Sequence, residues 1–473
     1  MKLKTTIDGQ AVDLNPNMKA TLERFNPLLN FESIRGAMVV DFEVPFSPTN
    51  DKFFGHYRTR QVPYPNKSYY CEKSANGLML EKGVVELRNV TERGYLLSFT
   101  QNLGEIFGDY QTLPINLIDW GSEIIPGTIL TTADHLTAKY CFPTILNPSF
   151  YGKEAVSGFA GKVNEWTGSA WNPDAPMVPM FFLRWLFEEI AELCDFTFQG
   201  EFFESDLFKK CVIYNTFSLD DRTTIEYKSH LPAMSIPELL KGLRKLYNLV
   251  LFFDVQNRVL TAKFAKTLFN QPVTLNLSSK IVPSYNRSPE RANRLELDWQ
   301  LDSNDGLMKV PPSDFLRYQT PQAGIRKGTL FGVVSSISTL PTDGTGFAKA
   351  DQPGITPIAG QLNNSFSPRI LFWHGVVSGH PTATNTLDDV TLAWHGSNNL
   401  VVNFWQEYRD WRAATSLKQS KMNLSAKEIY QLDFHGRQGE YISAYINGRN
   451  YLIGDMKTPL PIVDNSDVSL WEM

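Results

Sequence analysis

The chain opens with short alternating segments that are typical of β-strands. LKTTIDGQAVDL alternates around Asp8-Gly9, a dipeptide that suits the positive φ angles of a two-residue hairpin turn. AMVVDFEVPF, GLMLEKGVVELRNV and GYLLSFT follow, each bounded by Gly, Pro, Asn or Asp. Strands this short and frequent predict a barrel or a sandwich for residues 1–120.

Two helices are predicted after residue 179, where the periodicity changes. In MFFLRWLFEEIAELCDF the apolar positions fall at helical spacing, with charged positions between them. The second helix begins at an S-x-x-E capping box formed by Ser235 and Glu238. A hairpin, NLVLFF and VLTAKF, follows it. These helix-then-strand units predict a compact α+β domain over residues 180–265.

The rest of the chain alternates between long connections and β patterning. Residues 121–179 are rich in Pro and Gly and predict a long connection or a small subdomain, and 338–368 predict a long loop that is either mobile or moulded onto a partner. β patterning returns over 266–337. Residues 369–473 combine predicted strands, IYQLDF among them, with a helix in NFWQEYRDWRAAT and a second hairpin turn at Asn447-Gly448. The predicted fold class is α+β, mainly β.

Composition adds a hint about surfaces. The chain has 31 Phe, 18 Tyr and 10 Trp against a charged share of 20%, which favours surface buried against other molecules. The net charge is −5, and no window concentrates Lys and Arg as phosphate-backbone binding requires. No apolar stretch approaches the ~20 residues that span a bilayer. We therefore expect a soluble protein with no membrane span.

Motifs of enzyme chemistry are missing from the sequence. GxxxxGK[ST], GxSxG and HExxH do not occur, and the nearest approach to GxGxxG, at Gly344, lacks its last Gly and lies in the long loop. The acidic pairs Glu188-Glu189 and Asp220-Asp221 are expected on the polar face of a helix and in a turn. We expect no catalytic residue and no cofactor.

One cluster of histidines supplies imidazole groups of the kind that ligate metals. His374, His380 and His395 fall within about twenty residues, but no Asp, Glu or Cys completes a recognisable ligand spacing. These histidines are expected to pack in strands, and metal binding by the trio is the alternative. The cysteines have neither CxxC nor metal-knuckle spacing and are expected to be buried thiols: Cys71, Cys141, Cys194 and Cys211.

Three aromatic residues form the most distinctive remaining pattern. Trp405, Tyr408 and Trp411 lie at i, i+3 and i+6, which places them on roughly one face of the predicted helix. One interpretation is a stripe within the chain's own core. The other is an exposed anchor for another subunit, so these three are the candidate subunit-interface residues.

Four segments of the chain follow one another in a recognisable order. FNPLLNFESIRGAMVVDFEVPFSPTNDKFFGH and GLMLEKGVVELRNVTERGYLLSF lie near the start, SIPELLKGLRKLYNLVLFFDVQNRVLTAKF lies in the middle, and LSAKEIYQLDFHGRQGEYISAYINGRNYLIGDMKTPL lies near the end. In this order they resemble the baseplate hub, or tail-tip hub, proteins of tailed bacteriophages and prophages. Residues 121–179 and 338–368 lie outside this resemblance.

The resemblance implies two β-barrel-like domains that flank the α+β insertion. The first is 1–120, and 266–337 and 369–473 contribute to the second. It further implies a homotrimeric ring in the virion tail, assembled in the bacterial host cytoplasm. This ring would join the tail tube protein to the spike or tip protein, contact other baseplate proteins, and meet DNA only as passing cargo. No catalytic residue transfers from the family. The alternative is a carbohydrate-binding or carbohydrate-cleaving receptor-binding tail component, in which exposed Trp and Tyr stack on sugar rings.

Overall fold

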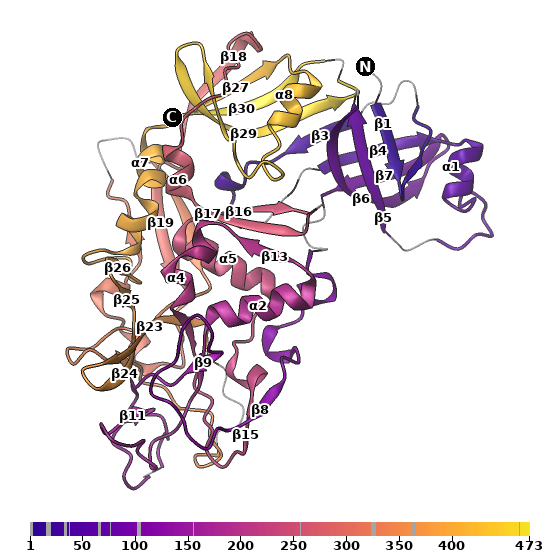
Figure 1. Cartoon of the computed structure of the whole chain (residues 1–473). Helices are drawn as coiled ribbons and strands as arrows, with labels where there is room; N and C mark the ends of the chain where they lie inside the picture. Colours follow the sequence, from indigo (N-terminus) through magenta and orange to yellow (C-terminus); the bar gives the residue numbers. More distant parts are fainter. Residues whose placement is uncertain are drawn as a thin grey trace.

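The protein has an upper sheet built mainly from both ends of the chain, with one strand from its middle, and a lower body built from the remaining middle of the chain (Figure 1). Both termini lie in the upper part. The computed structural model describes residues 3–15, 20–32, 36, 38–64, 68–75, 77–101, 106–154, 156–255, 257–322, 328–360, 366–462 and 464–473. None of the helices in these ranges is long and apolar enough to cross a membrane.

The upper part is an antiparallel sheet of 12 strands. Its order is β18-β27-β30-β29-β3-β4-β7-β6-β5-β1-β2, with β28 paired to β29. The strands are β1 (Leu3–Ile7), β2 (Gln10–Ala11), β3 (Ala20–Arg24), β4 (Met38–Pro45), β5 (Ser68–Ala75), β6 (Leu78–Val90), β7 (Gly94–Thr100), β18 (Ile281–Pro289), β27 (Ser416–Met422), β28 (Ser443–Ile446), β29 (Arg449–Leu460) and β30 (Ser466–Glu472).

The N-terminal and C-terminal strands meet where β3 pairs with β29. Glu23 lies opposite Lys457 and Leu22 opposite Thr458 in this register. One core accordingly draws on both ends of the chain, with Leu22 and Phe42 packed in the same cluster as Leu470. The strand order has two free ends, β18 and β2, so the described strands form one open sheet and no closed barrel.

Turn chemistry fixes the two predicted hairpins. Asp8 and Gly9 have φ angles of 45° and 75° between β1 and β2, and Asn447 and Gly448 have φ angles of 48° and 92° between β28 and β29. Asp, Asn and Gly tolerate this left-handed backbone better than other residues, which is why these dipeptides support tight turns. Both hairpin predictions are confirmed.

The lower body contains most of the helices. The α-helices among the described residues are α1 (Pro48–Phe53), α2 (Leu183–Cys194), α3 (Glu201–Glu204), α4 (Asp206–Lys209), α5 (Ile236–Tyr247), α6 (Ala265–Asn270), α7 (Gln406–Ala414) and α8 (Ala426–Gln431). At the start of α5 the carboxylate of Glu238 accepts from the backbone N–H of Ser235 at 2.7 Å, and Oγ of Ser235 accepts in return from the N–H of Glu238 at 3.4 Å. This capping box confirms the predicted helix start.

Short strands and long connections complete the lower body. Its strands are β8 (Ser122–Ile124), β9 (Tyr140–Cys141), β10 (Ile145–Leu146), β11 (Lys162–Val163), β12 (Met180–Phe181), β13 (Thr197–Gln199), β14 (Cys211–Tyr214), β15 (Thr224–Glu226), β16 (Leu249–Asp254), β17 (Val259–Phe264), β19 (Arg294–Trp299), β20 (Tyr318–Gln319), β21 (Leu330–Ser335), β22 (Ala348–Lys349), β23 (Arg369–Val377), β24 (His380–Thr384), β25 (Thr386–Leu387) and β26 (Val390–Thr391). The β16–β17 hairpin is the predicted one, and it packs with α2 and α5 in a second large core. The chain is thus α+β and mainly β, as the sequence predicts.

One predicted strand is wrong. The first half of IYQLDF, residues 429–431, ends α8, and residues 432–434 lie in the turn region after it. Ser425 and Glu428 make a second capping box before Ala426. The sequence carries two competing signals here: the S-x-x-E motif favours a helix start, and the alternation of Ile429 with neighbouring apolar residues favours a strand. The predicted helix nearby is confirmed, and one turn of π-helix at Val401–Trp405 precedes α7.

The two long connections lie against their own chain. In the described part of 338–368, β22 pairs in parallel with β10, and Leu340 and Ala350 are fully buried. Residues 121–179 contribute Ile145 and Val178 to the core of the lower body. Where the structure describes it, the 338–368 segment is therefore moulded onto this chain.

Candidate interaction surfaces

The structure places the three candidate interface residues inside the lower core. Trp405 and Tyr408 have no exposed surface, and Trp411 retains 9%. The indole of Trp405 donates to the carbonyl of Leu246 at 3.3 Å, and that of Trp411 donates to the carbonyl of Glu472 at 3.1 Å. This arrangement corresponds to the core-stripe interpretation and leaves the three side chains almost no area to offer a second chain.

The three clustered histidines have separate partners. His374 Nε2 lies 2.9 Å from the hydroxyl of Thr384, His395 Nε2 lies 3.2 Å from the carbonyl of Arg317, and the ring of His380 packs edge-on against Phe347. No group of three or more His, Cys, Asp or Glu side chains suited to a metal ion occurs in the described ranges. All four cysteines are buried free thiols, as predicted.

A buried ionic network that the sequence analysis missed lies beside the long loop. Arg369 is fully buried and donates to Asp305 at 2.6 Å, lies 3.5 Å from Asp302, and also donates to the side chain of Gln352. Asp302 and Asp305 stand in a motif that faintly resembles a calcium loop, but their carboxylates bind a guanidinium instead. Arg369 is 64 residues away from Asp305 in the sequence, so the spacing of nearby residues could not predict this ion pair.

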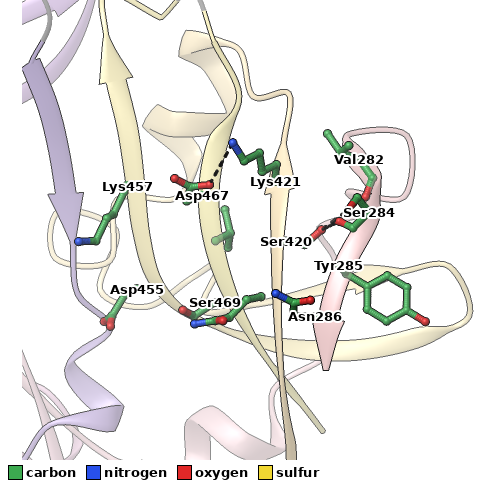
Figure 2. A pocket seen from close by; sticks show the side chains of 12 residues that line it. Val282, Ser284, Tyr285, Asn286, Ser420, Lys421, Asp455, Lys457, Asp467 and Ser469 are labelled. Carbon is green, nitrogen blue, oxygen red and sulfur yellow. Dashed lines mark hydrogen bonds and ion pairs between the residues drawn. The ribbon is translucent and has the colours of Figure 1, made fainter. Parts of the chain in front are cut away.

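A polar hollow of about 490 Å³ lies on the outer face of the sheet, across β18, β27, β30 and β29 (Figure 2). Lys421 pairs with Asp467 at 3.8 Å, and Lys457 pairs with Glu23 at 2.8 Å. In the sheet register Asp467 on β30 lies between Lys421 on β27 and Lys457 on β29, and Lys457 in turn lies opposite Glu23 on β3. Cations and anions therefore alternate across these four adjacent strands. Such a face is neutral in sum and offers no cluster of free cations to phosphate.

A second hollow of about 510 Å³ lies in the lower body between β8 and β9. Its polar end is a half-buried network in which Glu123 accepts from the hydroxyls of Tyr140 and Tyr227, while Lys139 donates to Tyr227 at 2.7 Å. Burial pushes the pKa of Glu123 upward, but the two hydroxyls and the charge of Lys139 outweigh it and hold that pKa below its ordinary value. The remaining lining is largely apolar, including Leu130 and Phe142.

Exposed apolar surface on this chain comes from aliphatic side chains and a few tyrosines. No described tryptophan or phenylalanine is among the exposed large hydrophobic residues. Instead, Ile124, Leu130 and Leu136 face solvent around the second hollow, and Val310 does so elsewhere on the lower body. Exposed Trp and Phe side chains are therefore not available on the described surface to form contacts with other molecules.

No protein-family description and no curated protein sequence matches this chain. Among solved structures, the 43 kDa tail protein of prophage MuSo2 from Shewanella oneidensis is 10% identical and aligns over 100% of this chain and 98% of its own, with a TM-score of 0.38. The prophage tail protein gp18 from Listeria monocytogenes EGD-e is 8% identical over 100% and 94%, with a TM-score of 0.39. A tail protein from Neisseria meningitidis MC58 is 8% identical over 99% and 95%, with a TM-score of 0.38. Scores below 0.5 do not establish a common fold, so we assign no property of these proteins to this chain.

Proposed function

We propose that this protein is a structural hub of a phage or prophage tail, a homotrimeric ring that joins the tail tube to the spike or tip. The observation that carries the proposal is the single sheet formed by both ends of the chain (Figure 1). The resemblance at the sequence level implies two β units flanking an α+β insertion. The pairing of β3 with β29 joins strands from the two ends of the chain edge to edge, which supports this arrangement. Three chains would then present six β units around one axis, which matches a six-fold tube above and a three-fold spike below.

Electrostatics support a channel through which DNA passes without binding. The chain has a net charge of −5, and the outer face around Lys421 and Lys457 has its cations paired with carboxylates. Proteins that hold DNA present free Lys and Arg along the phosphate backbone. We expect a structural role without catalysis, because the side chains that line the two hollows include no nucleophile paired with a histidine general base.

Purified tail particles test this proposal. An antibody against the chain is expected to label one end of the tail, at the junction of tube and tip, and the mass of the isolated chain at high concentration is expected to include a trimer. Labelling along the tube or on fibres would contradict the hub role. A monomer that also forms no ring with the tube and spike proteins would contradict it as well.

The receptor-binding alternative keeps tyrosine alone as its sugar-stacking residue. Every tryptophan in the chain is buried or half-buried, whereas Tyr64, Tyr70 and Tyr285 are exposed. Tyr285 is the one aromatic residue lining the polar hollow, and Lys418 already lies 4.2 Å from its ring centre. Glycan binding that depends on Tyr285 would revive this alternative.

A further inference from the structure

The surface around the second hollow exposes aliphatic side chains to an unusual degree. Ile124, Leu130 and Leu136 are 79%, 67% and 52% exposed, and among the described large hydrophobic residues only Val310 exceeds Ile124. We call residues 124–136, with the hollow they border, the 124–136 surface. Large apolar side chains this exposed, gathered in one short segment, are candidates for a site where a protein meets another molecule.

This surface is held in place by side chains from three other segments. The indole of Trp171 donates to the carbonyl of Ile129 at 2.8 Å, and that of Trp373 donates to the carbonyl of Ala133 at 2.9 Å. Arg184 on α2 donates to the carbonyl of His135 at 2.9 Å. The backbone is therefore fixed while its leucines face water, so a partner would bind with little ordering cost.

A second segment, the 309–317 loop, exposes apolar side chains beside cationic ones. Val310 is 84% exposed next to the exposed Lys309, and Leu316 is 50% exposed next to Arg317. Pro311 and Pro312 stiffen the loop. It is anchored by the buried Phe315, whose carbonyl accepts from the indole of Trp299 at 3.1 Å. This loop is likewise a fixed apolar projection.

Charge makes the two surfaces complementary. On the 124–136 surface, the carboxylate of Asp134 is 58% exposed and lies 3.9 Å from His135, which is charged only when protonated. Lys309 supplies an exposed cation beside Val310 on the loop. Arg317 already lies 3.5 Å from Glu296, so Lys309 is the cation we pair with Asp134.

We propose that the 309–317 loop of one copy binds the 124–136 surface of a neighbouring copy, with Val310 against Leu130 and Lys309 near Asp134. Two different surfaces on each chain make a head-to-tail contact, which closes into a ring when the rotation allows it. The proposal rests on the proposed hub function and names the surfaces through which its subunits meet.

Self-association of the full chain tests the apolar part of the contact. Leu130→Asp and Val310→Asp are each expected to weaken association by ~30-fold or more, the effect of a central interface side chain. Both side chains are exposed, so the substitutions leave the fold intact. The matched control is Leu78→Asp, an exposed aliphatic residue at the start of β6 in the upper sheet. Sedimentation velocity over a concentration series measures all three variants.

A double-mutant cycle tests the ionic part. Asp134→Asn keeps the acceptor that caps the backbone N–H of Leu136 at 3.0 Å and removes only the charge. This substitution and Lys309→Met are each expected to weaken association several-fold. If the two groups meet across the contact, the double variant loses no more than either single variant. Fully additive losses would show that they do not meet.

Engineered disulfides test the geometry directly. Leu130→Cys and Val310→Cys chains, mixed and oxidised, are expected to give covalent dimers that neither chain gives alone, and the native cysteines are all buried. A chain carrying both substitutions should give a ladder that ends at the closed ring. An oligomer that forms normally in the Leu130→Asp and Val310→Asp variants would overturn these surfaces and leave the hub proposal standing. A chain that stays monomeric at every concentration and never cross-links would overturn the contact, and the particle labelling would then decide the hub proposal separately.

Discussion

Arg24 offers the sharpest test of how the two ends of the chain are joined. Its guanidinium is buried in the upper core, where Nε donates to Glu81 at 2.6 Å and Nη2 donates to the carbonyl of Leu80 at 3.1 Å. Nη1 donates to the carbonyl of Ile429 in α8. One side chain on β3 thus holds β6 from the N-terminal segment and α8 from the C-terminal segment.

Arg24→Met leaves the carboxylate of Glu81 buried without its main cation. Breaking a buried pair in this way costs about 3–5 kcal/mol. Burial already raises the pKa of Glu81 to about 7 against the opposing charge of Arg24, so the variant's Glu81 takes up a proton more readily. The loss of stability is therefore expected to be smaller at pH 5 than at pH 8, because protonation removes the uncompensated charge.

Hydrogen exchange measures this loss where it occurs. The amides of β3 and β29 are expected to lose protection by ~100-fold or more in Arg24→Met, while those of α2 in the lower body serve as the internal reference. The double variant Arg24→Met, Glu81→Leu replaces the pair by apolar side chains and is expected to recover most of the protection. Unchanged protection in the single variant, or a double variant as unstable as the single one, would refute this account of the joint.

Three further outcomes are expected. Arg369→Met leaves Asp302 and Asp305 buried without a cation and lowers the stability of the lower body by about 3–5 kcal/mol, seen as an earlier thermal transition; an unchanged transition would contradict it. Burial lowers the pKa of Lys73 from 10.5 to about 8, so the ammonium form is less stable in the folded protein than in the unfolded chain. Between about pH 8 and 10.5 the unfolded chain therefore binds more protons, and the wild type gains stability as the pH rises. In urea denaturation Lys73→Met is thus expected to be more stable than wild type by ~3 kcal/mol at pH 7 and by ~1 kcal/mol at pH 10. A difference in stability that does not change with pH would show that the pKa of Lys73 is not lowered in the folded protein. Ser425→Ala removes the cap of α8 and costs about 1 kcal/mol, measured as faster exchange in α8 alone.

Local signals in the sequence predicted the elements that local chemistry controls. Asp8-Gly9 and Asn447-Gly448 turn where expected because few other dipeptides tolerate their φ angles. The capping box at Ser235 fixed the start of α5 for a similar reason. In α8, a capping box competed with an apolar alternation, and the cap prevailed because Ala426 and Ile429 pack on one face of a helix against the upper core.

Long-range pairing lay beyond what the sequence could predict. β3 and β29 are separated by more than 400 residues, and neither strand carries a signal that selects the other. The same holds for Arg369 with Asp302 and Asp305, and for the stripe at Trp405, whose helical spacing is compatible with a core and with an interface alike. Periodicity states which face of an element is apolar, but not what covers that face.

The aromatic-rich, weakly charged composition has an explanation inside the chain. Long connections leave backbone carbonyls without helix or sheet partners, and buried carbonyls need donors. The indoles of Trp171, Trp373 and Trp299 supply such donors to segments that flank exposed aliphatic residues. Aromatic side chains thus fix the backbone beneath exposed aliphatic side chains, Leu130 and Val310 among them. In the contact proposed above, the aromatic residues therefore act indirectly, by positioning the aliphatic side chains that the partner covers.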